Sequence, residues 1–546
     1  MIPIRPALAM PNKWIVALSI GFGSLMATID SSIVNVALPN IRGTVGATIE
    51  EITWISTAYI IAMVIVMPLT GFLGAFFGQK RVYLASLVLF VLGSMLCGVA
   101  RTLPMLVFYR IIQGLGAGSL QPTQQAILRQ TFPAKEQGMA MAVFSMIIMV
   151  GPAIGPTLGG WIVDNYSWPW IFYINVPVGA LGVFLTWRNV IEPDDVLRSN
   201  RLRAQAMRKN LDVAGIVLMC VGVCLLQYVL EEGQRNDWFE SKMITALSAI
   251  AVVSLALFVI RELTAPVPVV DLRLFRDRTF AAGTAIAGVM FAMLMGSMFL
   301  LPVFMQELLG FDAMQSGLVL MPRTLAMMVV TPIIGRIYNH VPPAIVVAVG
   351  ALLFVIGSYE LSHITLASSS GDIMIPMIVT GAGLACLFVP LTTAALTFIP
   401  RDKLADASGL NSFVRQIGGS LGLTIFATML GRYQTRASAT LAEHVSNVRP
   451  EATDRLSMIA HAMMARGQDA LAAQHTALAA VSGSVRLQAA VLAFEKTFLL
   501  QAVAFVIVLP LLGAWGGLPG IAAAVLLANA AVASRALRLL VRVVSD

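Results

Sequence analysis

The stretch Gly151-Pro152-Ala153-Ile154-Gly155-Pro156-Thr157-Leu158-Gly159-Gly160 lies within an uncharged run, residues 139–163, that is long enough to cross a bilayer as one helix. Gly151, Gly155 and Gly159 are four residues apart, so they form one stripe along a helix face. Such a stripe lets the backbone of a neighbouring helix approach closely. Pro152 and Pro156 form an adjacent stripe and each removes a backbone N–H. The pattern predicts a tightly packed helix that bends, serving either as a glycine-zipper packing element or as a transport hinge.

The whole chain has the composition of a membrane protein. Of its 546 residues, 58% are hydrophobic and 12% are charged, whereas soluble chains carry about 25% charged residues. The N-terminal apolar run has no small-residue cleavage site, so we interpret it as a retained first helix. Apolar runs predict fourteen transmembrane helices, near residues 14–38, 52–74, 82–100, 104–128, 139–163, 170–187, 213–230, 243–260, 279–301, 315–335, 342–362, 373–399, 407–431 and 497–519.

Lysine and arginine are distributed unevenly between the loops. If the chain starts in the cytoplasm, 22 of them fall in cytoplasmic segments and four in the short loops of the opposite side. This bias predicts a multi-pass protein of the inner (cytoplasmic) membrane with both termini in the cytoplasm. The net charge of +8 then reflects membrane orientation and predicts no nucleic-acid partner.

Two residues of opposite charge lie inside N-terminal spans. Asp30 is the only charged residue of the first predicted span, and Arg110 is the only one of the fourth. Intramembrane charges are costly and typically mark a substrate or ion pathway, although a structural hydrogen bond or ion pair is the alternative for Asp30. From the rise per residue, Asp30 lies about 12 Å and Arg110 about 9 Å from the outer ends of their spans. The two residues could therefore share one level of a cavity.

The two halves of the chain repeat a pattern of prolines and glycines. Pro122, Pro133, Gly151 and Gly155 of the first half correspond to Pro390, Pro400, Gly418 and Gly422 of the second. The offset of 267 residues, with the same sidedness of the loops, predicts parallel repeats related by an axis along the membrane normal. We therefore expect an N-terminal six-helix bundle (1–190), basic loops with two inserted helices (191–278), a C-terminal six-helix bundle (279–519) and a cytoplasmic tail (520–546).

Two segments outside the predicted spans have helical signals. In the outer segment 432–495, Pro450, Gly467 and Gly483 divide an Ala- and Leu-rich sequence into helix-length pieces, and the near-neutral charge argues against disorder. In the tail, Arg535, Arg538 and Arg542 share one face beside apolar residues, which predicts a helix on the membrane surface.

No pattern in the sequence predicts a cofactor. Gly114, Gly116 and Gly118 lie within a span and lack the strand–helix context of a nucleotide-binding loop. The four cysteines lie in spans without accompanying histidine or acidic ligands, so no metal site is expected. No nucleophile–base set that would suit an enzyme is apparent. Transport by this chain would therefore depend on an ion gradient.

Several motifs together resemble the fourteen-helix drug:proton antiporters of the major facilitator superfamily, most closely the EmrB type. The match covers roughly residues 14–518 and includes the segment 30–39, the glycine–proline stretch of residues 151–160 and two C-terminal motifs at 301–307 and 332–336. In the fourth span, the matching residues are Arg110, Gln113, Gly114, Gly116 and Ala117. The resemblance implies a major-facilitator-type fold with two six-helix bundles plus two inserted helices.

The resemblance also implies an activity and site residues. The chain would exchange amphipathic or hydrophobic drug-like compounds for protons, with Asp30 as the proton carrier and Arg110 as its charge partner. The expected substrate cavity comprises Asp30, Gln113, Met146 and Glu307. The expected conformational motifs comprise Gly71, Gly78, Lys80 and Arg81 in the loop after the second span, and Gly151, Pro152, Gly155, Pro156 and Gly159 in the fifth. Ala75 and Phe76 stand where the family's loop motif has an acid and an arginine, so another contact must hold the outward-open state.

The implied partners are membrane lipid, a periplasmic adaptor (membrane fusion) protein and an outer-membrane channel, which would form a tripartite efflux system. The segment 432–495 is then either a docking surface for the adaptor or a helical lid over the exit. A narrow-specificity exporter of a fatty acid, lipid or natural product is the alternative transport function. A non-transporting sensor or scaffold is disfavoured, because it has no need of opposite charges in adjacent apolar helices.

Overall fold

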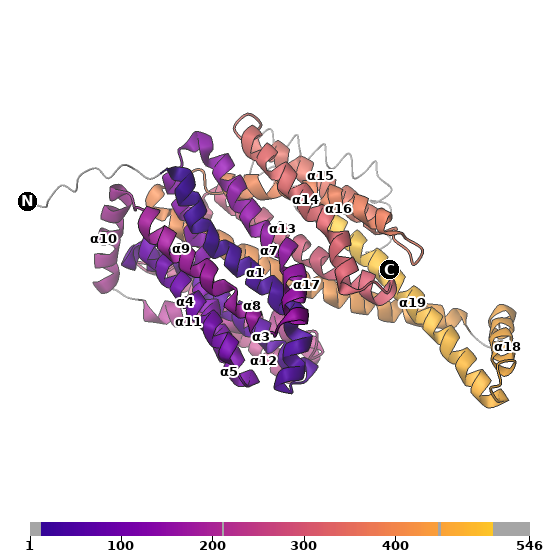
Figure 1. The fold of residues 1–546 in the computed structure, drawn as a ribbon. Coiled ribbons are helices and arrows are strands. Elements are labelled where there is room, and N and C mark those ends of the chain that lie inside the picture. The colour runs from indigo at the N-terminus through magenta and orange to yellow at the C-terminus, as the bar shows by residue number, and fades with distance from the viewer. Residues whose placement is uncertain (1–11, 210–211, 446–448, 506–546) are drawn as a thin grey trace, which may run out of the picture.

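The computed structural model describes residues 12–209, 212–445 and 449–505, and over these residues it contains helices and no strands (Figure 1). The described residues include fourteen helical segments long and apolar enough to cross a membrane, which confirms the predicted number of spans. The predicted tail helix, with Arg535, Arg538 and Arg542, lies outside the described residues.

The first bundle consists of the first six spans. The fourth span is interrupted at Gly118 and Ser119, and the sixth is divided at Ile174. The elements are α1 (Lys13–Val45), α2 (Ile49–Ile52), α3 (Trp54–Phe77), α4 (Gln79–Val99), α5 (Leu103–Ala117), α6 (Leu120–Thr131), η1 (Ala134–Glu136), α7 (Gln137–Asn165), α8 (Trp170–Tyr173) and α9 (Asn175–Asn189).

The segment between the bundles contains the two inserted spans and, where the sequence predicts a basic loop, a helix. This helix, α10 (Asp194–Lys209), is too charged to cross a membrane. The other elements of the segment are α11 (Val213–Glu232), η2 (Trp238–Glu240), α12 (Lys242–Thr264) and η3 (Leu272–Arg276).

The second bundle contains the last six spans and the outer segment. Its elements are α13 (Arg278–Val303), the π-helical turn η4 (Phe304–Leu308), α14 (Ala313–Ile337), α15 (Pro343–Leu361), α16 (Ser370–Ala394), η5 (Arg401–Lys403), α17 (Leu404–His444), α18 (Pro450–Met464) and α19 (Ala470–Ala504).

Helix packing is similar in the two bundles. The fifth spanning helix packs against the first in each bundle, α7 on α1 and α17 on α13. In the second pair, Gly418 and Gly422 of α17 lie against the backbones of Gly288 and Ala292 of α13. Small residues permit this close approach because no side chain separates the backbones. This arrangement agrees with the repeat seen in the sequence.

The outer segment is a helical extension of the last two spans. Pro450 begins α18, and Gly467, with φ +90°, lies in the turn before α19, as their residue types predict. The prediction that Gly483 ends a helix is wrong, because α19 continues through it. One glycine costs a helix about 1 kcal/mol, which the neighbouring Ala and Leu residues offset. The helix that contains the last span begins well before the expected residue 497, because α19 starts at Ala470 in the outer segment.

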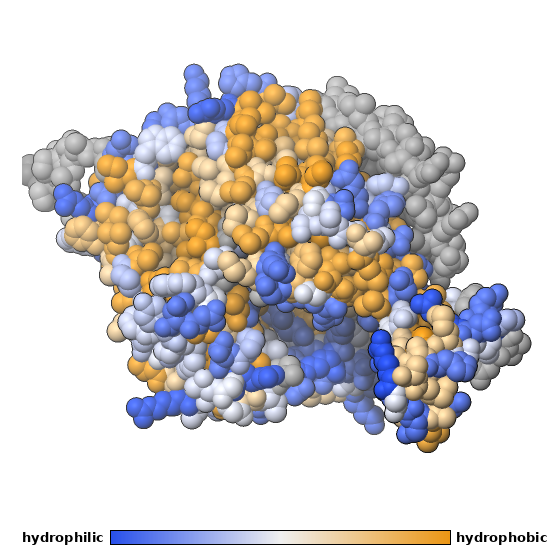
Figure 2. All heavy atoms as spheres, turned by 45° about the vertical axis from the view of Figure 1, so that its right-hand side comes forward, coloured by the Kyte–Doolittle hydropathy of each residue, from blue (hydrophilic) through white to orange (hydrophobic). Residues whose placement is uncertain are grey.

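The two bundles contact each other more closely at one end of the molecule than at the other. We call α18 and the adjoining end of α19 the outer extension. The side where α1 begins is the N side, and the opposite side, where the outer extension lies, is the α18 side. Four hydrogen bonds join the bundles directly among the described residues, and all lie in the half nearer the N side: Arg129 to Thr393 O, Gln130 to Arg401 O, Asn339 to Lys135 O and Ser408 to Pro122 O. Figure 2 shows a hollow in the surface beside the α18–α19 tip. The structure is therefore closed on the N side.

Candidate functional site

Asp30 of α1 and Arg110 of α5 form an ion pair in the interior of the first bundle. Arg110 Nη1 lies 2.6 Å from Asp30 Oδ2, and the two side chains are 1% and 0% exposed. A buried pair of this kind is costly to break, because removing one partner leaves an uncompensated charge. The two intramembrane charges predicted from the sequence therefore meet directly.

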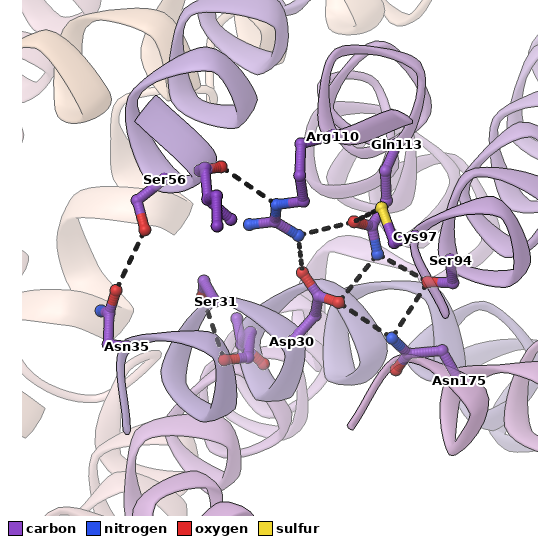
Figure 3. A network of polar contacts seen from close by, with 11 residues as sticks. Asp30, Ser31, Asn35, Ser56, Ser94, Cys97, Arg110, Gln113 and Asn175 are labelled. Carbon is purple, nitrogen blue, oxygen red and sulfur yellow. Dashed lines mark hydrogen bonds and ion pairs between the residues drawn. The ribbon is translucent and has the colours of Figure 1, made fainter. Parts of the chain in front are cut away.

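Amide side chains complete the coordination of Asp30 (Figure 3). Its Oδ1 accepts hydrogen bonds from Gln113 Nε2 at 2.8 Å and from Asn175 Nδ2 at 2.9 Å. Both amides also donate to Ser94 Oγ, at 2.6 and 3.1 Å. The carboxylate thus receives three donors from α5 and α9, which hold it in one orientation.

Arg110 makes two further hydrogen bonds and a contact with an aromatic ring. Its Nε donates to Ile55 O at 3.1 Å, and its Nη1 also donates to Gln113 Oε1 at 2.5 Å. The guanidinium carbon lies 4.0 Å from the centre of the Tyr59 ring, a cation–π contact. Because α1, α3, α4, α5 and α9 all contribute, any change in the charge of the pair affects five helices together.

Sequence reasoning missed Ser94, Asn175, Tyr59 and the Ile55 carbonyl. Uncharged polar residues in apolar helices commonly form packing hydrogen bonds, so none of the four has a distinctive signal. Their contribution depends on α4 and α9 lying beside α1, which sequence spacing does not specify.

The expected cavity residues do not form one group. Asp30 and Gln113 are in contact, whereas no described contact joins Met146 or Glu307 to them. Met146 is half-buried on α7, and Glu307 is exposed in η4. Nearer the α18 side, exposed Asn35 and half-buried Ser56 are joined by a 3.3 Å hydrogen bond (Figure 3). They extend polar surface along α1 beyond the ion pair.

The glycine stripe of α7 packs against the helix that carries Asp30. Gly151 lies against Thr28 and Gly155 against Ser32, so closely that an added Cβ would collide with these residues. Gly159 approaches Ile33, and Pro152 is half-buried in the same stretch. The helix continues through both Pro152 and Pro156. The stripe therefore faces α1 within its own bundle.

The contact of α7 with the second bundle lies at its N-side end. There Gly138 packs against Tyr338 and Gly335, and Gly335 packs against Ala142. α7 therefore contacts α14 at its N-side end and α1 along the glycine stripe.

Gly71 of the loop motif contacts an acid of the other bundle. Asp406 of α17 lies directly against the Cα of Gly71, where a Cβ would not fit. Asp406 is buried and accepts two hydrogen bonds from Arg203 of α10, one of them 3.0 Å from Nη2 to Oδ1. Asp406 thus joins α3, α10 and α17 on the N side.

The other residues of the loop motif hold the turn between α3 and α4. Gly78 has φ +91°, a conformation that suits glycine. The Lys80 N–H donates to Glu192 Oε1 at 2.5 Å, and Lys80 Nζ donates to Trp187 O at 2.7 Å. Burial raises the pKa of the Glu192 carboxyl, an effect that this hydrogen bond and the charges of Lys80 and Arg81 oppose. The turn is thereby joined to the segment leading into α10.

The sequence matches the Major Facilitator Superfamily over residues 20–423. It is 37% identical over 438 residues to the multidrug export protein EmrB of Haemophilus influenzae, an alignment covering 80% of this chain and 84% of that protein. Identity to EmrB of Escherichia coli K12 is 34% over 446 residues, with coverages of 82% and 85%. The fatty acid resistance protein FarB of Neisseria gonorrhoeae is 32% identical over 496 residues, with coverages of 91% and 94%.

The fold agrees with this match. The crystal structure of the human organic anion transporter MFSD10 (TETRAN) superposes with a TM-score of 0.58 at 13% identity, covering 91% of this chain and 100% of that one. The chain therefore belongs to the Major Facilitator Superfamily, a class of non-enzymatic membrane transporters, and within it to the branch of EmrB-type multidrug transporters.

Proposed function

We propose that the protein exports amphipathic or hydrophobic drug-like compounds in exchange for protons. The observation that carries the proposal is the buried Asp30–Arg110 pair with its amide donors. Asp30 is the one acid within the membrane interior of the described spans of the first bundle. Its position among five helices makes it a site where proton binding can alter helix packing.

The chemistry of coupling follows from charge balance. With Asp30 ionised, the pair is neutral overall and the carboxylate matches three hydrogen-bond donors. A proton delivered to Asp30 leaves the Arg110 charge uncompensated in a region of low dielectric, which is unfavourable. Protonation therefore favours a rearrangement that exposes or re-pairs Arg110, and release of the proton restores the arrangement seen here.

The membrane orientation follows from the charge bias described above. We place the N side in the cytoplasm, with the protein in the inner membrane and both termini cytoplasmic. The structure then corresponds to the state closed toward the cytoplasm, from which an exported compound leaves on the α18 side.

Transport in proteoliposomes with an imposed pH gradient tests this function. We expect uphill movement of a lipophilic dye that an uncoupler abolishes. Asp30→Asn should bind the dye but fail to move it against its gradient, because the residue no longer takes up a proton. Uphill transport at the wild-type rate by this variant would refute the role of Asp30.

The outer extension supports a further part of the proposal, docking of a periplasmic adaptor that leads to an outer-membrane channel. Figure 1 shows α18 and the adjoining end of α19 projecting away from the bundles. Ala460 of α18 packs with Ala473 and Ala477 of α19, so the projection has its own small core. A projecting hairpin suits a docking surface better than a lid.

A narrower specificity is the second candidate, because FarB, a fatty acid resistance protein, aligns over 91% of this chain. Export of a fatty acid, another lipid or a natural product would use the same proton-coupling pair. Comparing the transport of fatty acids with that of unrelated lipophilic dyes in the same proteoliposomes separates the two functions.

A further inference from the structure

Arg415 of α17 and Arg323 of α14 are buried charges that the proton-coupling site does not use. Their side chains lie in the second bundle and are 2% and 5% exposed. The ion pairs of the described residues include neither of them. Outside the described residues the only acid is Asp546, at the end of the chain. Because a guanidinium stays protonated, the interior of this bundle carries two positive charges that no carboxylate of the described residues neutralises.

Arg415 has unused donors in an aromatic setting. Its Nη2 reaches Ser412 Oγ at 3.3 Å, whereas Nε and Nη1 have no hydrogen-bond partner among the described residues. The guanidinium carbon lies 4.9 Å from the ring centre of Phe291 and 5.6 Å from that of Phe388. A planar fork of N–H groups matches a carboxylate, and the two rings can contact an apolar body attached to it.

Arg323 lies farther toward the α18 side. Its Nη1 donates to Ser297 Oγ at 2.9 Å, and Nη2 has no partner among the described residues. Ser297 is six residues beyond Phe291 on α13, a rise of about 9 Å. Since Phe291 lies at the middle of α13, the two charges extend from the centre of the membrane toward the α18 side.

The buried arginines of the two bundles differ in their charge partners. In the first bundle Asp30 neutralises Arg110, whereas in the second no carboxylate among the described residues pairs with Arg415 or Arg323. An unpaired charge within a membrane protein is costly and typically marks an ion or substrate pathway. An anion that enters the second bundle would remove this cost, and a cation would increase it.

We propose that Arg415, assisted by Arg323, binds the carboxylate of an amphipathic organic anion, with Phe291 and Phe388 contacting the adjoining apolar part. This assignment rests on the proposed export function and names its substrate class. Arg415 is buried while the bundles are closed on the N side, so the anion reaches it when that side opens. Arg323 then provides a second positive charge on the way to the α18 side.

Equilibrium binding to the purified full-length protein tests the assignment with three probes of equal chain length. These are dodecanoate, the neutral dodecanol and the cationic dodecyltrimethylammonium, each measured at a pH where dodecanoate is ionised. We expect the wild type to bind dodecanoate about tenfold or more tightly than dodecanol, since hydrogen bonds to charged groups are the stronger kind. The cation should bind most weakly.

Arg415→Gln should lose about tenfold in affinity for dodecanoate and little for dodecanol, and Arg415→Lys should lie between this variant and the wild type. Arg432→Gln is the matched control, because it removes the same charge from an exposed position of the same helix. Equal loss for all three probes in Arg415→Gln would show a structural role and overturn the assignment. So would a wild type that binds dodecanol as tightly as dodecanoate.

The export function is measured separately, with the same purified variants reconstituted in proteoliposomes. Uncoupler-sensitive efflux of a neutral dye reports on proton coupling and does not depend on the charge of the probe. If this efflux is present and dodecanoate shows no preference, the anion site fails while the export function stands. If efflux itself is absent, the proposed function fails, whatever the binding data show.

Discussion

Asp406 of α17 lies against the Cα of Gly71 of α3, and Arg203 of α10 donates two hydrogen bonds to its carboxylate. The contact joins the two bundles on the N side. Arg203 binds it from α10, the helix in the segment between the bundles. Lys403 of η5 extends the link, since its Nζ lies 2.7 Å from Asp271 Oδ2. On the N side, Asp406 thus links the second bundle to both α3 and α10.

We expect Asp406→Asn to open the N side more often, because the half-buried Arg203 then loses its counter-ion. Distances between spin labels at residues 77 and 398, measured in a cysteine-free background, should shift toward longer values. Arg401→Gln is the control, because its pair with Asp195 at 3.7 Å is exposed on the same side and contributes little. Unchanged distances in Asp406→Asn would exclude the contact as a latch.

Asn175→Leu should destabilise the first bundle and slow proton-driven exchange. The substitution removes a donor from Asp30 and leaves a buried acceptor with one bond fewer, a loss of about 1–3 kcal/mol. Thermal unfolding in detergent and exchange in proteoliposomes measure the two effects. Asn35→Ala, which removes an exposed 3.3 Å bond, should change neither. Similar behaviour of the two variants would contradict the role given to Asn175.

Gly155→Leu should block transport while the protein still inserts in the membrane. The new side chain would collide with Ser32 of α1, and overpacking of this kind typically costs about 1–3 kcal/mol. Gly160→Leu on the same helix is the control, since no atom lies within 4 Å of a Cβ at that position. Normal exchange by Gly155→Leu would show that α1 and α7 need not stay in close contact.

Leu471→Gln combined with Leu478→Gln should weaken capture of a periplasmic adaptor by the outer extension. Both leucines are exposed and lie seven residues apart on one face of α19, a different face from that of the alanines that contact α18. The fold of the hairpin should be unaffected, as circular dichroism can verify. Pull-down of the adaptor and vesicle transport are measured together. Undiminished capture would place the docking site elsewhere.

Much of the architecture is determined by the sequence itself. Runs of apolar residues specify the number of spans, since a bilayer requires about 20 such residues for each crossing. The isolated charges of Asp30 and Arg110 stand out for the same reason, because a charge in lipid is costly wherever the helix lies. The turn at Gly467 and the helix start at Pro450 follow from local backbone preferences.

Contacts between distant helices were decided by the tertiary structure alone. Asn175 joins Asp30 across 145 residues, and Asp406 meets Gly71 across the two bundles. The glycine stripe could have faced either bundle, and packing placed it on α1. Helical periodicity defines which residues share a face, but the partner of that face depends on how all the helices pack together. The unpaired state of Arg415 was equally invisible in the sequence, because a partner can come from any part of the chain.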